Sequence, residues 1–87
     1  MGNLNRKSTI MGQDKLNIEL SKAEALVLFE FLARFNQIDQ RDLFEHQSEQ
    51  RVLWNSESYL EKQLTEPFAP NYIDLIKKAR ESVGDKE

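Results

Sequence analysis

The chain has 87 residues, a net charge of −3 and no cysteine, which excludes disulfides, thiolate metal sites and thiol catalysis. No stretch approaches the ~18 to 20 apolar residues of a membrane span, and the first residues lack the layout of a secretory signal. We expect one small, soluble, cytoplasmic domain whose hydrophobic core supplies only a few kcal/mol of stability.

The N-terminal part predicts a leader followed by a strand. Residues 1–14 are polar and lack periodicity, which is typical of a flexible leader. In residues 16–20, apolar and polar side chains alternate, so that Asn17 and Glu19 lie opposite the apolar face. A short hairpin with residues 9–11 is an alternative way to pair this strand.

A helix is predicted directly after the strand. Ser21 and Glu24 have the spacing of a capping box, which places the first helical residue at Lys22. The apolar sector of residues 22–35 is unusually wide, so we expect neighbours on more than one side. Glu30 and Arg34 form a favourable pair one turn apart.

A second helix is predicted over residues 40–65, with Asp39 as its cap. Leu53, Leu60 and Leu64 form its apolar stripe. Residues 45–51 interrupt the pattern, so a break near Ser48 is the alternative.

Two prolines, Pro67 and Pro70, predict the end of the second helix, with Phe68 filling the corner. Asn71 is the expected cap of a third helix, which Gly84 ends, and residues 85–87 should fray. The apolar stripe of this helix consists of Tyr72, Ile76, Ala79 and Val83.

The predicted fold class is α+β and mostly α, with one N-terminal strand and three antiparallel helices in a single domain over residues 15–84. The first helix should lie at the centre. The second should lie across it, and the third should close the open side.

Catalytic and metal-binding patterns are weak. His46 is the only histidine, and Asp42 lies one helical turn before it. Together they offer two metal ligands, which is too few for a dedicated metal site. Glu57 and Glu61 are one turn apart, but the usual reason for such a pair is a solvated helix face. No glycine-rich loop is present to bind phosphate. We therefore predict no catalytic residue, cofactor or metal.

The charge distribution disfavours nucleic acid as a partner. Residues 21–66 contain nine acidic and five basic side chains, whereas the only basic cluster is Lys77, Lys78 and Arg80 near the C-terminus. Cations at that position suit the dipole of a helix.

Another protein is the expected partner. Arg51 and Trp54 are residue types enriched at interface hot spots, and one turn of helix would let them stack, although a lone tryptophan is also a common core residue. Glu57, Glu61, Asn17 and Glu19 complete the predicted partner-binding set. A single strand also leaves its backbone groups unpaired, which favours a homodimer over the hairpin, with a foreign strand as a third possibility.

Three segments resemble a group of short, uncharacterised bacterial proteins: residues 20–32, Glu-Gln-Arg-Val-Leu-Trp at 49–54, and residues 60–68. Ser56 departs from the larger apolar residue of that pattern. The resemblance implies an immunity-type or antitoxin-type protein and brings no site residues with it. We predict a noncatalytic acidic protein that binds a partner, such as a basic toxin. A structural or regulatory homodimer is the alternative.

Overall fold

The computed structural model describes residues 15–84, which form three α-helices and two 3-10 turns. The predicted leader (residues 1–14) and tail (residues 85–87) lie outside the described residues. In chain order the elements are α2 (Lys22–Phe35), η1 (Arg41–Leu43), α3 (Gln47–Gln63), η2 (Glu66–Phe68) and α4 (Tyr72–Gly84).

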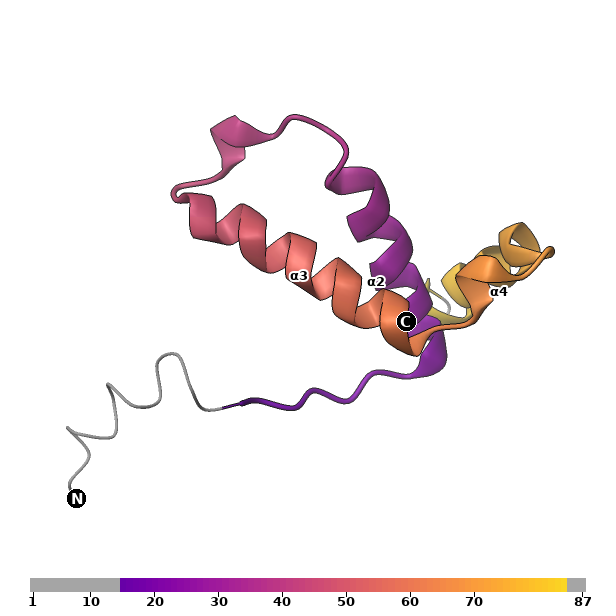
Figure 1. Cartoon of the computed structure of the whole chain (residues 1–87). Helices are drawn as coiled ribbons and strands as arrows, with labels where there is room; N and C mark the ends of the chain where they lie inside the picture. Colours follow the sequence, from indigo (N-terminus) through magenta and orange to yellow (C-terminus); the bar gives the residue numbers. More distant parts are fainter. Residues whose placement is uncertain (1–14, 85–87) are drawn as a thin grey trace, which may run out of the picture.

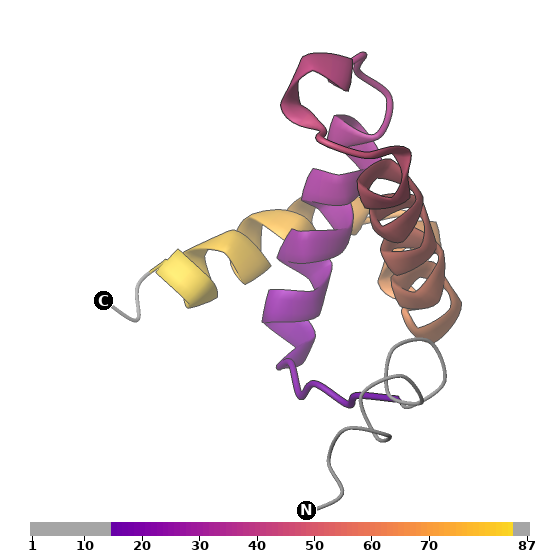
Figure 2. The same cartoon turned by 90° about the vertical axis from the view of Figure 1, so that its left-hand side faces the viewer.

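The central element is α2, which packs against both other helices, as predicted (Figure 1). The chain returns along one side of α2 as α3, which runs in the opposite direction. Figure 2 shows α4 crossing the other side of α2, so the prediction of three antiparallel helices is wrong for α4.

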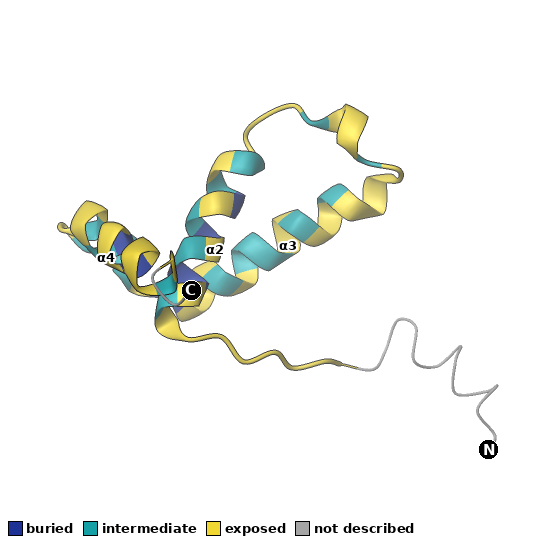
Figure 3. Cartoon of the chain, turned by 180° about the vertical axis from the view of Figure 1, so that it is seen from behind, coloured by how far each residue is buried: buried dark blue, intermediate teal, exposed yellow. Residues whose placement is uncertain are grey.

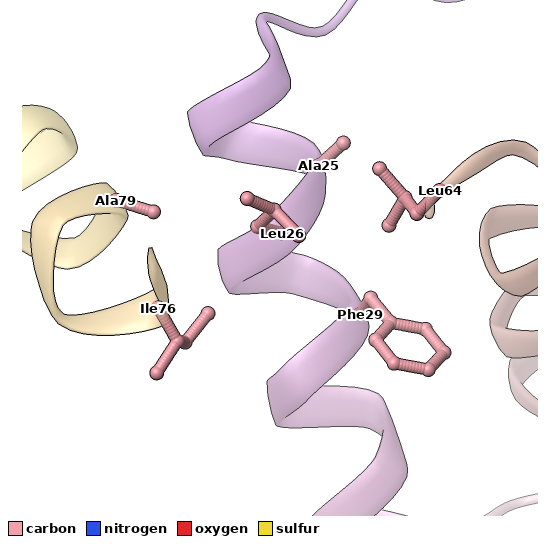
Figure 4. Close-up of a cluster of buried hydrophobic side chains, with 6 residues drawn as sticks. All are labelled: Ala25, Leu26, Phe29, Leu64, Ile76 and Ala79. Atoms are coloured by element: carbon pink, nitrogen blue, oxygen red, sulfur yellow. The ribbon is translucent and has the colours of Figure 1, made fainter. Parts of the chain in front are cut away.

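The core lies on two sides of α2 because its apolar residues cover a wide sector of the helix. Figure 4 shows Leu64 beside Ala25 and Phe29 on one side, and Ile76 and Ala79 on the side of Leu26. These six side chains remain between 4% and 9% exposed, and no described side chain is completely enclosed. Figure 3 shows that α3 contributes no buried residue of its own. The core is therefore thin.

The start of α2 confirms the predicted capping box. The Glu24 amide donates to Ser21 Oγ at 3.0 Å, and the Ser21 amide donates to Glu24 Oε1 at 2.8 Å. Two backbone amides that α2 leaves unpaired at its start are satisfied in this way. The helix begins at Lys22, as expected.

The predicted strand is not found. Residues 15–21 have no regular secondary structure, and no strand occurs anywhere in residues 15–84. Leu16 is 92% exposed and Ile18 is 80% exposed. Alternating side chains define two faces, but a strand also requires a neighbouring strand to pair its amides and carbonyls. The hairpin arm considered for that role, residues 9–11, lies outside the described residues.

The prediction of one helix over residues 40–65 is also wrong, since α3 begins at Gln47. The Asp39 carboxylate accepts from the Arg41 amide at 3.2 Å and starts the η1 turn instead of capping a long helix. His46 is the actual cap, because its Nδ1 accepts from the Ser48 amide at 3.0 Å. Polar side chains that bind nearby amides compete with a continuous helix, which explains the break near Ser48.

The connection between α3 and α4 follows the prediction in outline. Its prolines follow the end of α3, and Asn71 immediately precedes α4, accepting from the Leu75 amide through its backbone oxygen at 3.1 Å. Phe68 is 72% exposed and does not fill the corner, contrary to expectation. Leu64 is buried against α2 instead, because it is the last residue of the α3 stripe that faces α2.

Truncation of the core should distinguish buried from exposed leucines. We expect Leu26→Ala to lower the free energy of unfolding by about 2 to 5 kcal/mol, because it leaves a cavity between α2 and α4. Leu43→Ala, at an exposed position, should change it by less than about 0.5 kcal/mol. Chemical denaturation followed by circular dichroism measures both. Equal losses in the two variants would contradict the two-sided core.

Loss of the capping box should weaken α2. We expect Ser21→Ala to lower the free energy of unfolding by about 1 kcal/mol, because the Glu24 amide loses its acceptor. Ser82→Ala, the same change at an exposed position inside α4, is the control and should be neutral within about 0.5 kcal/mol. The same denaturation measurement applies, and a neutral Ser21→Ala would show that the cap contributes little.

Candidate partner-binding surface

Three ion pairs join charged side chains within residues 15–84. Asp39 accepts from the guanidinium of Arg41 at 3.0 and 2.8 Å, and this pairing lowers the pKa of the Asp39 carboxyl. A shallow hollow of about 380 Å³ beside this pair is lined by Asp39, Arg41 and Asp42. No group of three or more histidine, aspartate or glutamate side chains in the described chain is arranged to hold a metal ion.

Three of the five basic side chains in residues 21–66 form ion pairs with carboxylates. Lys22 contacts Glu66 at 2.8 Å, Arg34 contacts Glu30 at 3.6 Å, and Arg41 contacts Asp39 at 2.8 Å. The bond from Lys22 also lowers the pKa of the Glu66 carboxyl. The acidic surplus is left on residues 42–63, whose charged side chains are Asp42, Glu45, Glu49, Glu57 and Glu61 against Arg51 and Lys62.

Four of the six predicted partner-binding residues lie on α3. Arg51 and Glu61 are exposed, and Trp54 is 48% exposed. No ring contact joins Arg51 to Trp54 within residues 15–84, so the expected stacking does not occur. Instead, the guanidinium of Arg34 lies over the Phe31 ring, with its Cζ atom 5.7 Å from the ring centre.

Glu57 has an internal role that the sequence pattern did not predict. Its Oε1 accepts from Asn36 Nδ2 at 2.8 Å, and the same nitrogen donates to the Leu53 carbonyl at 3.3 Å. Asn36 is the cap at the end of α2, so this pair of bonds joins that end to the middle of α3. The side-chain oxygen of Asn36, Oδ1, is buried and has no hydrogen-bond partner among the described residues. Glu57 is therefore only partly accessible to a partner.

The other two predicted residues, Asn17 and Glu19, are exposed on the segment that precedes α2. No described contact joins them to Arg51, Trp54 or Glu61. The six residues therefore belong to two separate elements and do not form one continuous set.

An apolar groove that the sequence interpretation missed lies at the start of α3. We call it the α3 groove; it has a volume of about 480 Å³ and is lined by Leu43, Phe44, Ser48, Glu49, Val52 and Leu53. Leu43 is 64% exposed and Val52 is 59% exposed. Phe44 is anchored by an edge contact with Phe35, at 6.2 Å between ring centres. The helix break caused the miss, because a continuous helix over 40–65 would have directed Leu43 and Phe44 differently.

A second polar link joins α2 to α4. The Tyr72 hydroxyl donates to Glu30 Oε1 at 2.8 Å, and the other oxygen of Glu30 faces Arg34. Burial raises the pKa of Tyr72 to about 12, with a further contribution from the hydrogen bond to Glu30. Tyr72 therefore stays protonated above its ordinary range and keeps donating to α2.

No known protein family, curated protein or solved structure matches the chain. The resemblance to short bacterial proteins stays a prediction. None of the helices in residues 15–84 has the length and apolar character needed to cross a bilayer.

The Tyr72 link should make stability fall at high pH. Because the pKa is raised in the folded state, the contribution of this group is fully present below about pH 10 and is lost as pH rises through about 12. In a pH titration followed by tyrosinate absorbance, we expect Tyr72→Phe to remove the step at the highest pH. The same variant should lose less stability as pH rises. Tyr59→Phe is the matched control and should keep the step. A step that persists in Tyr72→Phe would contradict the assignment.

Proposed function

We propose that this protein is a noncatalytic, acidic protein-binding module of the immunity or antitoxin type, which neutralises a basic partner protein in the cytoplasm. The observation that carries the proposal is the α3 groove, where exposed apolar side chains lie within the acidic part of the chain. Solvent-exposed apolar grooves with a polar rim are typical of protein-binding sites.

The side chains that line the α3 groove indicate what kind of partner surface would fit it. Leu43 and Val52 offer apolar surface, so the partner should insert at least one apolar side chain there. Glu49 lines the groove, and Glu45 precedes the same helix. A rim of lysine or arginine on the partner would complement these carboxylates. Such charge complementarity speeds encounter and makes association sensitive to salt.

A binding role also fits how the polar groups of the described residues are used. The carboxylates of Asp39 and Glu66 bind cations of the same chain, and His46 caps α3. The arrangement favours structural bonds over acid–base chemistry, which needs ionisable groups converging on one point. The net charge of −3 likewise disfavours nucleic acid as the target.

Affinity capture from the native host tests the proposal. We expect the immobilised chain to capture one basic protein in stoichiometric amount at low salt and to release it as salt rises, because the contact is partly ionic. Val52→Asp should abolish capture by placing a charge in the groove. Ile73→Asp, at an exposed position on α4, should leave capture unchanged.

Circular dichroism confirms that both variants are folded before capture is compared. Absence of any stoichiometric partner would refute the proposal. Equal capture by Val52→Asp and the unaltered chain would exclude the α3 groove as the binding surface.

A structural or regulatory homodimer without a foreign target is the second candidate. The observation that favours it is the exposure of Leu16 and Ile18 on an extended segment. A monomer in sedimentation of the isolated chain would exclude this second candidate, because it requires a stable dimer in the absence of other proteins. A dimer is compatible with both candidates, and affinity capture then decides whether there is a foreign target.

A further inference from the structure

The segment before α2 is an extended run with one apolar face. Leu16, Ile18 and Leu20 alternate with polar residues, and exposure falls from 92% at Leu16 through 80% at Ile18 to 42% at Leu20. No backbone group of residues 15–20 has a hydrogen-bond partner among the described residues. Exposed apolar side chains next to unpaired amides and carbonyls are the features of an edge available for pairing.

The apolar face of this segment borders a groove in the helical body. The groove has a volume of about 280 Å³ and is lined by Ile18, Leu20, Lys22, Ala25, Leu60, Gln63 and Leu64. Ala25 and Leu64 belong to the core, so the groove borders the core at this point. In Figure 1 the segment leaves the start of α2 as an extended tube. Additional apolar side chains placed beside it would cover both the segment and the groove.

We infer that residues 16–20 pair antiparallel with the same residues of a second copy, about a two-fold axis at Ile18. In this register Ile18 faces Ile18 of the second copy and Leu16 faces Leu20. On the other face Asn17 lies opposite Glu19, and the diagonal neighbours of Glu19 are Lys15 and Glu19 of the second copy. The apolar residues meet one another, and no like charges are directly opposed.

Neighbouring registers are worse for identifiable reasons. A two-fold axis at Glu19 would place two glutamates directly opposite each other, which is destabilising. An axis at Asn17 would place Asp14 opposite Leu20, which brings a carboxylate to the apolar face. Because side chains alternate, the register alone decides which residues meet. The sequence of residues 14–20 therefore selects Ile18 as the centre.

The fall in exposure from Leu16 to Leu20 also suits the two-fold pairing. Leu20 is close to the body of its own chain, whereas Leu16 is the most exposed side chain of the three. The two-fold pairing brings Leu20 of one copy to Leu16 of the other at both ends of the ribbon. An isolated two-stranded ribbon is marginal in water, but each strand here leads directly into a capped helix of its own body. The pairing thus joins two thin cores.

Sedimentation of the full-length chain at micromolar concentration tests the dimer without any foreign protein, so its outcome is independent of the affinity-capture experiment. We expect a dimer. Asn17→Lys should tighten it, and Asn17→Glu should weaken it, because position 17 faces Glu19 of the second copy twice in each dimer. The dissociation constants of these two matched variants should differ by about tenfold.

Single-cysteine variants test the register directly, because the chain has no cysteine of its own. We expect Ile18→Cys to form an intermolecular disulfide rapidly on addition of diamide. Leu16→Cys and Leu20→Cys should each form it slowly, since identical residues four positions apart in the ribbon exceed the ~7 Å between Cα atoms that a disulfide spans. An equimolar mixture of Leu16→Cys and Leu20→Cys should crosslink much faster than either variant alone, because mixed dimers place position 16 opposite position 20.

A monomer throughout this concentration range would overturn the inference and would leave the intrachain hairpin or a foreign strand as the occupant. A dimer with equal dissociation constants for Asn17→Lys and Asn17→Glu would also overturn it. So would a dimer that crosslinks fastest at position 16 or 20 in single variants. Circular dichroism checks that each variant retains its helices.

Discussion

Ala25 and Phe29 face Leu64 on one side of α2, while Leu26 faces Ile76 and Ala79 on the other. This two-sided burial of one helix is the interaction on which the other elements depend, because α3 and α4 each find their main apolar contact on α2. At about 25 cal/mol per Å² of apolar surface, a core of so few side chains supplies limited stability. The polar links from Glu30 to Tyr72 and from Asn36 to Glu57 hold the same two interfaces at other points.

A thin core leaves apolar surface on the outside. No residue of α3 is buried, and its apolar side chains contact α2 with only part of their area. The outward part, at Val52 and its neighbours, forms the α3 groove together with the residues of the helix break. Leu16 and Ile18 are likewise exposed, and Ile18 lines the groove beside Ala25 and Leu64. Both proposed contacts therefore lie where the fold has not covered its own hydrophobic residues.

The two surfaces differ in the partner that they suit. The α3 groove lies in the part of the chain where acidic side chains outnumber basic ones, so a second copy of this chain would bring like charges together there. A basic foreign protein suits it better. In residues 15–20, Lys15 balances Glu19, and no like charges are directly opposed in the two-fold register, which suits self-association. One chain can use both surfaces at once if each is confirmed.

The sequence by itself determined the elements that depend on contacts a few residues apart. The Ser21 and Glu24 spacing specified the start of α2, the prolines marked the end of α3, and the stripe containing Ile76 and Ala79 identified the buried face of α4. These predictions succeeded because caps, breaks and amphipathic faces are set within one or two helical turns. Among the predicted partner-binding residues, Trp54 is half exposed, whereas the bond from Glu57 to the end of α2 was not foreseen.

Only the tertiary structure decided the rest. Asp39 and His46 each accept from an amide two residues further on, and these bonds divide the predicted long helix. The bonds are local, but apolar periodicity does not reveal them, and only the folded chain shows that the break places Leu43 and Phe44 beside Val52 in a groove. The crossing of α4 over α2 was decided by how the side chains of two helices fit together, which no periodicity encodes. Residues 16–20 have the pattern of a strand but find none to pair with in residues 15–84. Alternation fixes which side chains share a face, whereas the ladder of hydrogen bonds depends on a neighbour from elsewhere.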